Sequence, residues 1–306
     1  MINIIVGNCL ETLKELPDQS VNCCVTSPPY FGLRDYGHAD QIGNESTPDE
    51  FVGRLVDVFA EVRRVLRDDG TLWLNLGDTY AQSEIRIRNG QGNISSKRKA
   101  AVEQTGRKPN HGLKPKDLIG IPWLVAFAMQ ADGWYLRQDI IWHKPNPMPE
   151  SVTDRCTKAH EYLFLLSKNE RYFFDSEAIQ EKAATVGKPR AFGAKDQVGT
   201  MRNDIGRVFE DDGTRNKRSV WPVNVQPFTG AHFATFPPDL IMPCILAGCP
   251  ENGTVLDPFG GAGTTGLVAH WHNRNAILCE LNPAYAQLAK DRIMENDPMF
   301  AHVEVS

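Results

Sequence analysis

A short apolar strand that runs directly into a cluster of glycines constrains the fold of this chain more than any other feature. The strand Thr254-Val255-Leu256-Asp257 is followed by Pro258-Phe259-Gly260-Gly261-Ala262-Gly263-Thr264-Thr265-Gly266, and the apolar run 267–272 predicts a helix. Glycines let the backbone approach a ligand closely, and the start of a helix offers free N–H groups. A second strand at 276–279 leads to Glu280, 23 residues after Asp257, where a carboxylate suits ribose hydroxyls. These residues predict a nucleotide-type cofactor pocket.

The residues around the glycines narrow the choice of cofactor. Gly261, Gly263 and Gly266 satisfy the GxGxxG spacing of dinucleotide-binding motifs, but the strand runs into them through Asp-Pro-Phe. No lysine follows the glycines, which argues against a phosphate-binding P-loop.

Length and composition set broad bounds. The 306 residues suffice for one large α/β domain with an inserted subdomain, or for two domains. No apolar run approaches the roughly 20 residues of a membrane span, and the first residues lack the basic start of a signal peptide. The seven cysteines show no CxxC pair and no zinc-ligand spacing, so we expect no metal site and a reducing, cytoplasmic environment. The net charge of −5 argues against a uniformly basic nucleic-acid binder.

The distribution of apolar residues predicts strands and helices in alternation. Strands are expected at 2–6, 21–26, 71–76, 135–142 and 162–166, and helices at 11–16, 51–66 and 121–131. Asp68-Asp69-Gly70 is expected to end the second helix, and from residue 254 onward the chain alternates strand and helix. This order predicts a three-layer α/β fold, a doubly wound and mostly parallel sheet with helices on both faces.

Two stretches interrupt this pattern. Residues 84–117 contain nine Lys or Arg against three acids, a net charge of +6, and they predict a basic loop without apolar periodicity. A second glycine-rich, charged stretch spans 176–219. The two stretches divide the chain into 1–83 with 118–175, and 220–306.

A second signature, Thr26-Ser27-Pro28-Pro29-Tyr30, follows the expected strand at 21–26. Prolines cannot continue a sheet ladder, so the chain must turn out of the sheet there. Alone, this segment could be an ordinary surface turn. Beside the glycine signature, it resembles the (D/N/S)-P-P-(Y/F/W) motif of amino-methyltransferases. The resemblance implies that the Ser27 hydroxyl and the Pro28 carbonyl accept the N–H groups of an exocyclic amine, and that Tyr30 stacks on the base; Pro29 completes the catalytic motif.

The order of the two signatures points to one family. The catalytic motif precedes the cofactor motif, which resembles the permuted beta class of DNA amino-methyltransferases, and Asp-Pro-Phe-x-Gly-x-Gly-Thr-Thr is similar to the S-adenosylmethionine motif of these enzymes. Segments 66–78, 142–146, 149–151, 154–155 and 231–237 are similar as well. The resemblance implies S-adenosylmethionine as cofactor, bound by Asp257, Pro258, Phe259, Gly261, Gly263, Thr264, Thr265, Glu280, Phe236 and Asn8.

Two positions leave the resemblance incomplete. Asn8 stands where many relatives carry aspartate, and it can hydrogen-bond but brings no charge. His160 and Glu161 are open to two interpretations of equal weight. They could have a structural role, as an ion pair or the start of a strand, or they could have a functional role.

The resemblance also implies a substrate. Serine at the first motif position is commoner in cytosine-N4 enzymes, so the expected target is the N4 amine of a cytosine flipped out of double-stranded DNA, with adenine N6 as the alternative. The family keeps its target-recognition region at the place of 176–219. Contacts with DNA are expected from Lys97, Arg98, Lys99, Arg202, Arg215 and Arg218. A homodimer is possible, and no membrane partner is expected. A prokaryotic or phage origin is consistent with the resemblance.

Three rival functions remain open. A cytosine-C5 methyltransferase needs a nucleophilic cysteine, but Pro243-Cys244 is followed by Ile245 in an apolar run that predicts a core helix. An RNA or protein amino-methyltransferase is disfavoured by the motif order. The intact Ser27, Tyr30 and Gly263 argue against a DNA-binding module without activity.

Overall fold

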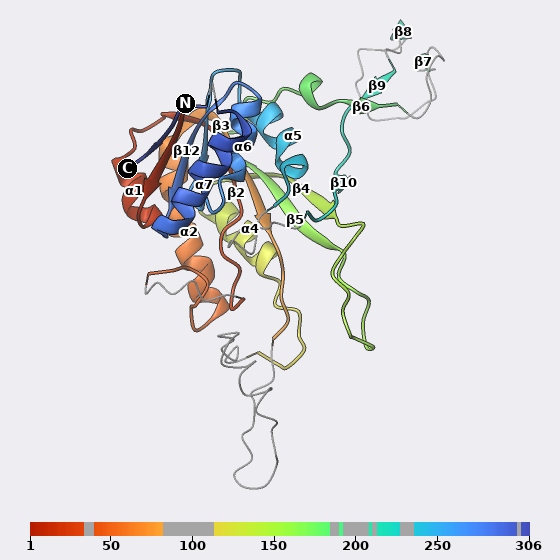
Figure 1. The fold of residues 1–306 in the computed structure, drawn as a ribbon. Helices are drawn as coiled ribbons and strands as arrows, with labels where there is room; N and C mark the ends of the chain where they lie inside the picture. Colours follow the sequence, from red (N-terminus) through yellow and green to blue (C-terminus); the bar gives the residue numbers. More distant parts are fainter. Residues whose placement is uncertain are drawn as a thin grey trace.

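The computed structural model describes residues 1–33, 40–81, 113–183, 190–191, 208–209, 213–226, 236–298 and 301–306. Its centre is a nine-stranded sheet in the order β10-β4-β5-β3-β2-β11-β12-β1-β13 (Figure 1). Within this sheet β5 alone runs antiparallel to its neighbours. The strands are β1 (Ile2–Val6), β2 (Val21–Thr26), β3 (Leu66–Leu76), β4 (Tyr135–His143), β5 (His160–Ser167), β10 (Val220–Pro222), β11 (Thr254–Asp257), β12 (Asn275–Glu280) and β13 (Val303–Val305).

Helices cover both faces of the sheet. One face packs against α5 (Pro238–Gly248), α6 (Thr264–Trp271) and α7 (Pro283–Asn296), and the other against α1 (Cys9–Glu15), α2 (Pro48–Val65) and α4 (Ile121–Ala131). Successive strand residues point to opposite faces, so Val255 joins the first core and Leu256 the second. The predicted three-layer, mostly parallel α/β fold is confirmed.

The position of β2 beside β11 brings the two sequence signatures together. These strands are parallel, with Cys23 opposite Val255 and Cys24 opposite Leu256. The carboxyl ends of parallel strands meet at one edge of a sheet, and such edges hold ligands in α/β proteins. The Ser27-Pro28-Pro29-Tyr30 turn therefore leaves the sheet next to the glycine turn, although 230 residues separate Ser27 from Asp257.

One expected boundary is wrong. Asp68-Asp69-Gly70 do not end the helix, because α2 ends at Val65 and residues 66–76 form the single strand β3. Leu66 pairs with Val21, and the register with β2 shifts before Cys23 pairs with Thr71. The helix also begins earlier than the apolar pattern indicates, since the Thr47 hydroxyl caps it by accepting from the Glu50 N–H at 3.2 Å.

The two interrupting stretches lie largely outside the described residues, so the division of the chain at 84–117 and 176–219 stays a prediction. The second stretch contributes the pair β6 (Glu181–Lys182) and β9 (Thr214–Arg215), and the pair β7 (Arg190–Ala191) and β8 (Val208–Phe209). Figure 1 shows these pairs standing away from the main sheet.

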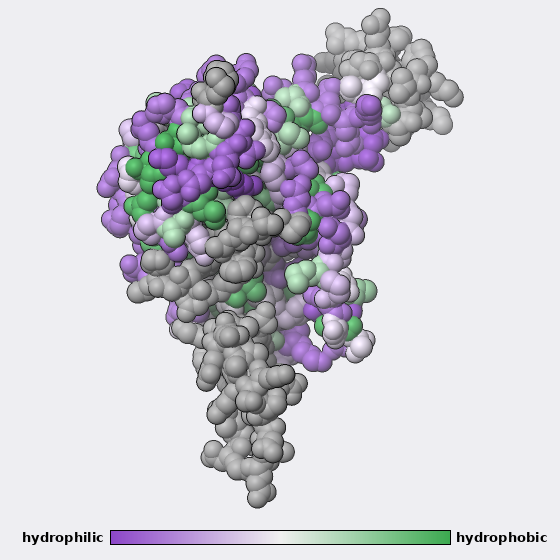
Figure 2. All heavy atoms as spheres, in the orientation of Figure 1, coloured by the Kyte–Doolittle hydropathy of each residue, from purple (hydrophilic) through white to green (hydrophobic). Residues whose placement is uncertain are grey.

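The surface seen in Figure 2 is largely hydrophilic over the described residues, with hydrophobic residues in small groups. Among the helices that the structure describes, none has both the length and the hydropathy that a membrane span requires.

Candidate active site

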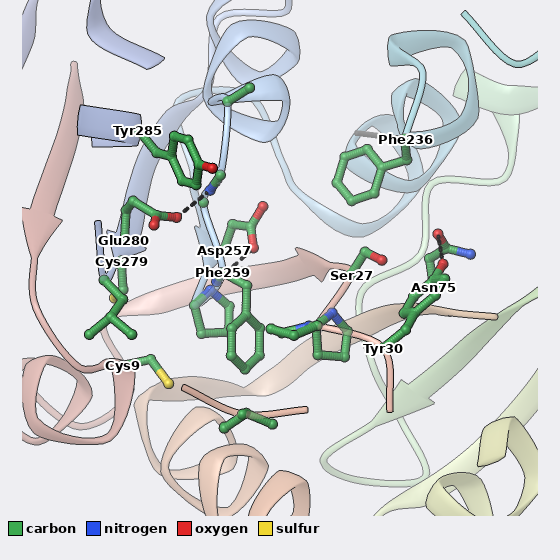
Figure 3. A pocket seen from close by; sticks show the side chains of 18 of the residues that line it. Cys9, Ser27, Tyr30, Asn75, Phe236, Asp257, Phe259, Cys279, Glu280 and Tyr285 are labelled. Atoms are coloured by element: carbon green, nitrogen blue, oxygen red, sulfur yellow. Dashed lines mark hydrogen bonds between the residues drawn. The ribbon is translucent and has the colours of Figure 1, made fainter. Parts of the chain in front are cut away.

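A cavity of about 530 Å³ opens at the edge where β2, β11 and β12 end (Figure 3). Its wall contains most of the predicted cofactor and catalytic residues: Asn8, Ser27, Pro28, Pro29, Tyr30, Phe236, Asp257, Pro258, Phe259, Gly261, Thr264 and Glu280. Gly263 and Thr265 are not in the wall, but both bond to residues that are: the Gly263 N–H donates to the Gly260 carbonyl, and the Thr265 hydroxyl donates to the Asp257 carboxylate.

The glycine turn takes a backbone conformation that favours glycine. Gly261 and Gly263 have φ angles of 51° and 74°, which side chains rarely adopt. The Gly260 N–H donates to the Cys279 carbonyl at 2.8 Å, and the Gly263 N–H donates to the Gly260 carbonyl at 2.8 Å. The turn ends at Gly263, and α6 begins at the next residue, Thr264. The helix therefore starts three residues earlier than Leu267, the start expected from the sequence.

Glu280 ties the glycine turn to the next loop. One carboxylate oxygen accepts from the Gly261 N–H at 2.8 Å, and the other accepts from the Asn282 N–H at 2.9 Å. Tyr285 from α7 lies beside it in the cavity wall (Figure 3). The carboxylate thus has a structural role in addition to the ribose contact predicted for it.

We expect Glu280→Ala to weaken S-adenosylmethionine binding by roughly 10- to 100-fold, the loss typical of one or two hydrogen bonds to a charged group. The variant loses both the acceptor for the ribose and the anchor of the Gly261 N–H. Isothermal titration calorimetry measures the affinity, and Glu251→Ala, an exposed glutamate in the turn before β11, is the matched control. Equal affinity in both variants would exclude Glu280 from the cofactor site.

Asp257 joins the catalytic strand to the cofactor turn. Its side chain is buried; one oxygen accepts from the Thr26 hydroxyl at 2.6 Å and from the Phe259 N–H at 3.0 Å. The other oxygen accepts from the Thr265 hydroxyl at 2.7 Å. Burial raises the pKa of Asp257 from 3.8 to about 6, while these three hydrogen bonds favour the ionised form.

This pKa predicts a pH-dependent stability. The folded state holds the Asp257 proton more tightly than the unfolded state, so the stabilisation is present below about pH 4 and is lost as the pH rises through about 6. Asp257→Asn has no carboxyl to titrate, so its free energy of unfolding, relative to that of the parent chain, should rise by about 2 kcal/mol between pH 4 and 7. Urea unfolding at several pH values measures it. A difference that stays constant over this range would contradict the argument.

Tyr30 is held by polar groups at the other end of the cavity. Its hydroxyl donates to Glu161 at 2.7 Å and lies 3.5 Å from the Asn75 side-chain oxygen. Burial and the negative charge of Glu161 raise the pKa of Tyr30 well above its ordinary value, so the phenol stays protonated. A Cβ at Gly77 would lie 2.5 Å from the Tyr30 ring, so glycine is needed there to leave room for it.

Sequence reasoning missed most of this polar network. Glu161 also pairs with Lys144, whose ammonium lies 4.2 Å above the Trp142 ring, and all three residues line the cavity. The ion pair that the sequence left open for Glu161 therefore exists, and it faces the Tyr30 hydroxyl. No signal within one segment indicates this contact, because Tyr30 and Glu161 are 131 residues apart.

The predicted DNA-contact residues are only partly described. Lys97, Arg98, Lys99 and Arg202 lie outside the described residues. Arg215 and Arg218 both donate to Glu181, at 2.9 Å and 2.7 Å, beside the β6–β9 pair. A DNA contact by either arginine would compete with this carboxylate.

Cys244 lies in the core, as its apolar surroundings predict. It is fully buried in α5 and is absent from the cavity wall. Burial raises the pKa of its thiol well above the ordinary value, which argues against the thiolate that cytosine-C5 chemistry requires. In the part of the chain that the structure describes, no group of three or more His, Cys, Asp or Glu could hold a metal ion.

Known proteins resemble this chain over most of its length. Residues 21–291 match the model of the N6/N4 methyltransferase family, described as DNA methylase. Type II methyltransferase M.Cfr9I of Citrobacter freundii is 48% identical over 293 residues, which cover 95% of this chain and 87% of that protein. M.SmaI of Serratia marcescens is 46% identical over 291 residues, covering 95% and 90% of the two chains.

Solved structures show the same fold. The putative DNA modification methylase TTHA0409 from Thermus thermophilus, complexed with S-adenosyl-L-methionine, superposes with a TM-score of 0.62, 25% identity and full coverage of both chains. The cytosine-N4-specific PvuII DNA methyltransferase gives a TM-score of 0.63 at 18% identity, covering 99% of this chain and 94% of that one. Because the identity is only 18%, the similarity to the PvuII enzyme concerns the fold alone.

Proposed function

Because this chain belongs to the N6/N4 family of DNA methylases, we propose that it transfers the methyl group of S-adenosylmethionine to the N4 amine of a cytosine flipped out of double-stranded DNA. Family membership gives the reaction class, an S-adenosylmethionine-dependent methylation of an amino group in DNA. The choice of cytosine rests on one observation, the serine at the first position of the motif that leaves β2 at the cavity.

The cavity wall suits this cofactor. Glu280 offers a carboxylate for ribose hydroxyls, and Phe259, Phe236 and Tyr285 offer aromatic surface for the adenine ring and the cationic sulfonium. We assign the cofactor to the end formed by the glycine turn, Asn8 and Tyr285. When bound, S-adenosylmethionine supplies an electrophilic methyl group.

We assign the target base to the end formed by Ser27, Pro28 and Tyr30. An exocyclic amine is a poor nucleophile because its lone pair is delocalised into the ring. Acceptance of its two N–H groups by the Ser27 hydroxyl and the Pro28 carbonyl would favour a geometry in which that lone pair is available. Tyr30, oriented by Glu161, would stack on the base. The amine attacks directly, so positioning accounts for much of the rate.

The remaining assignments are also proposals. The stretch 176–219 would recognise the DNA sequence, and the basic loop 84–117 would follow phosphates through Lys97, Arg98 and Lys99. Residues 1–83 and 118–175 would form the catalytic half of the domain, and 220–306 the cofactor half.

The product identifies the base. The protein is incubated with tritiated S-adenosylmethionine and either duplex DNA or RNA, and the digested nucleosides are analysed by mass spectrometry. We expect N4-methylcytosine in DNA. N6-methyladenine would overturn the assignment of cytosine as the target base but keep the proposed mechanism. In contrast, 5-methylcytosine, or methylation of RNA alone, would overturn the proposed function. Cys244→Ser should retain activity, apart from some loss of stability in a packed helix.

A further inference from the structure

We propose that Met148 acts as a wedge that enters the DNA base stack at the place vacated by the target base. The proposal rests on the proposed function, because a flipped base is what leaves this place open. Met148 lines the same cavity as Ser27 and Tyr30, yet the residue is 84% exposed. It therefore stands at the rim of the cavity, where DNA must lie if a base enters.

The loop that carries Met148 is braced on both sides. The Asn146 amide donates to the Val225 carbonyl at 3.0 Å and accepts from the Val225 N–H at 2.8 Å. On the other side, the Glu150 carboxylate accepts from Arg155 at 2.6 Å and from the Lys158 N–H at 3.3 Å. Pro147 and Pro149 flank the methionine and restrict the backbone further. Met148 is thus presented on a restrained backbone, although its own side chain contributes little to the core.

The charged side chains of this loop all have partners within the protein. Lys144 pairs with Glu161, Glu150 with Arg155, and Asp154 with Lys116. The Lys158 ammonium donates to the Asp78 carbonyl at 3.0 Å. Every Lys, Arg, Asp and Glu of the connection from β4 to β5 is therefore engaged within the protein, which favours an apolar contact over a phosphate contact for its tip.

The shape of this region agrees with such a contact. Figure 1 shows the connection between β4 and β5 extending beyond the end of the sheet, and Figure 2 shows hydrophobic as well as hydrophilic residues on that projection. Methionine is among the apolar side chains that proteins insert between base steps. Its flexible thioether adapts to an aromatic partner. A side chain in the vacated place would offset part of the cost of unstacking the target base.

The test compares Met148→Ala with Met148→Leu on two duplexes that contain the methylated site mapped by sequencing. In one duplex the target base is paired, and in the other it stands opposite an abasic site, where flipping is easier. We expect Met148→Ala to lower kcat/KM at least about tenfold on the paired duplex and less than about twofold on the abasic one. Met148→Leu keeps an apolar wedge and should behave like the parent chain.

Two controls separate a wedge role of Met148 from a general effect of removing an exposed apolar side chain and from a loss of cofactor binding or stability. Phe127→Ala removes an exposed apolar side chain on α4, outside the cavity wall, and should change neither value. Calorimetry should show unchanged S-adenosylmethionine affinity and melting temperature in Met148→Ala. An equal loss of kcat/KM on both duplexes, or no loss on either, would overturn the proposal that Met148 acts as a wedge. A parent chain that methylates no cytosine N4 would overturn the proposed function instead; if it methylates adenine, the same pair of duplexes tests the wedge on that base.

Discussion

Replacing Ser27 with alanine should lower the rate of methyl transfer about 10²- to 10³-fold, the effect of losing one preorganised hydrogen bond in a transition state. The affinity for S-adenosylmethionine should stay nearly unchanged. Ser27 orients the target amine and attacks nothing, and it lies at the other end of the cavity from Glu280 (Figure 3). The loss of a transition-state contact lowers kcat, whereas the loss of a ground-state contact raises Kd.

Single-turnover assays with tritiated S-adenosylmethionine measure the rate of the Ser27 variant, and calorimetry measures its cofactor affinity. Ser20→Ala is the matched control, because Ser20 is exposed just before β2 and its hydroxyl donates only locally, to the Pro17 carbonyl. A parallel loss of cofactor affinity in Ser27→Ala would place Ser27 against the cofactor, and an unchanged rate would remove it from the mechanism.

Gly263→Ala should raise the Kd for S-adenosylmethionine at least about 100-fold and lower the stability by about 1–3 kcal/mol. Gly263 has a φ of 74°, and an added Cβ would lie 2.8 Å from the Cβ of Ala289 and 3.1 Å from its Cα. Both the backbone and α7 must shift, and the glycine turn at the cofactor site shifts with them.

Two further variants make the Gly263 result interpretable. Gly53→Ala introduces a methyl group in α2 where nothing lies within 4 Å, and should stabilise the protein by roughly 0.5–1 kcal/mol without changing cofactor affinity. The double variant Gly263→Ala with Ala289→Gly removes the Cβ–Cβ contact but keeps the strained φ, so it should recover only part of both losses. Calorimetry together with urea unfolding gives both quantities, and cofactor binding that is unaffected in Gly263→Ala would contradict the role of the turn.

Elements defined by nearby residues could be predicted closely. The strands at 2–6, 21–26 and 254–257 and the helix at 121–131 have the predicted bounds. Their apolar periodicity acts within a few residues and needs no distant partner. Where the boundary depends on pairing, as at Leu66 opposite Val21, the prediction was wrong. The Ser-Pro-Pro-Tyr and glycine signatures, with their order, sufficed for the family and the cofactor.

The tertiary structure alone decided how the side chains of the site are used. Asp257, expected to bind the cofactor, has its carboxylate between Thr26 and Thr265, and Thr26 lies 231 residues away in the chain. The Glu161 carboxylate became the partner of Tyr30 because β5 lies next to β3, whose Asn75 and the following Gly77 face the same ring. Residue types and spacing determine which chemistry a segment can offer. Strand order determines which distant segments meet, because it is set by burial over the whole sheet and leaves no local pattern.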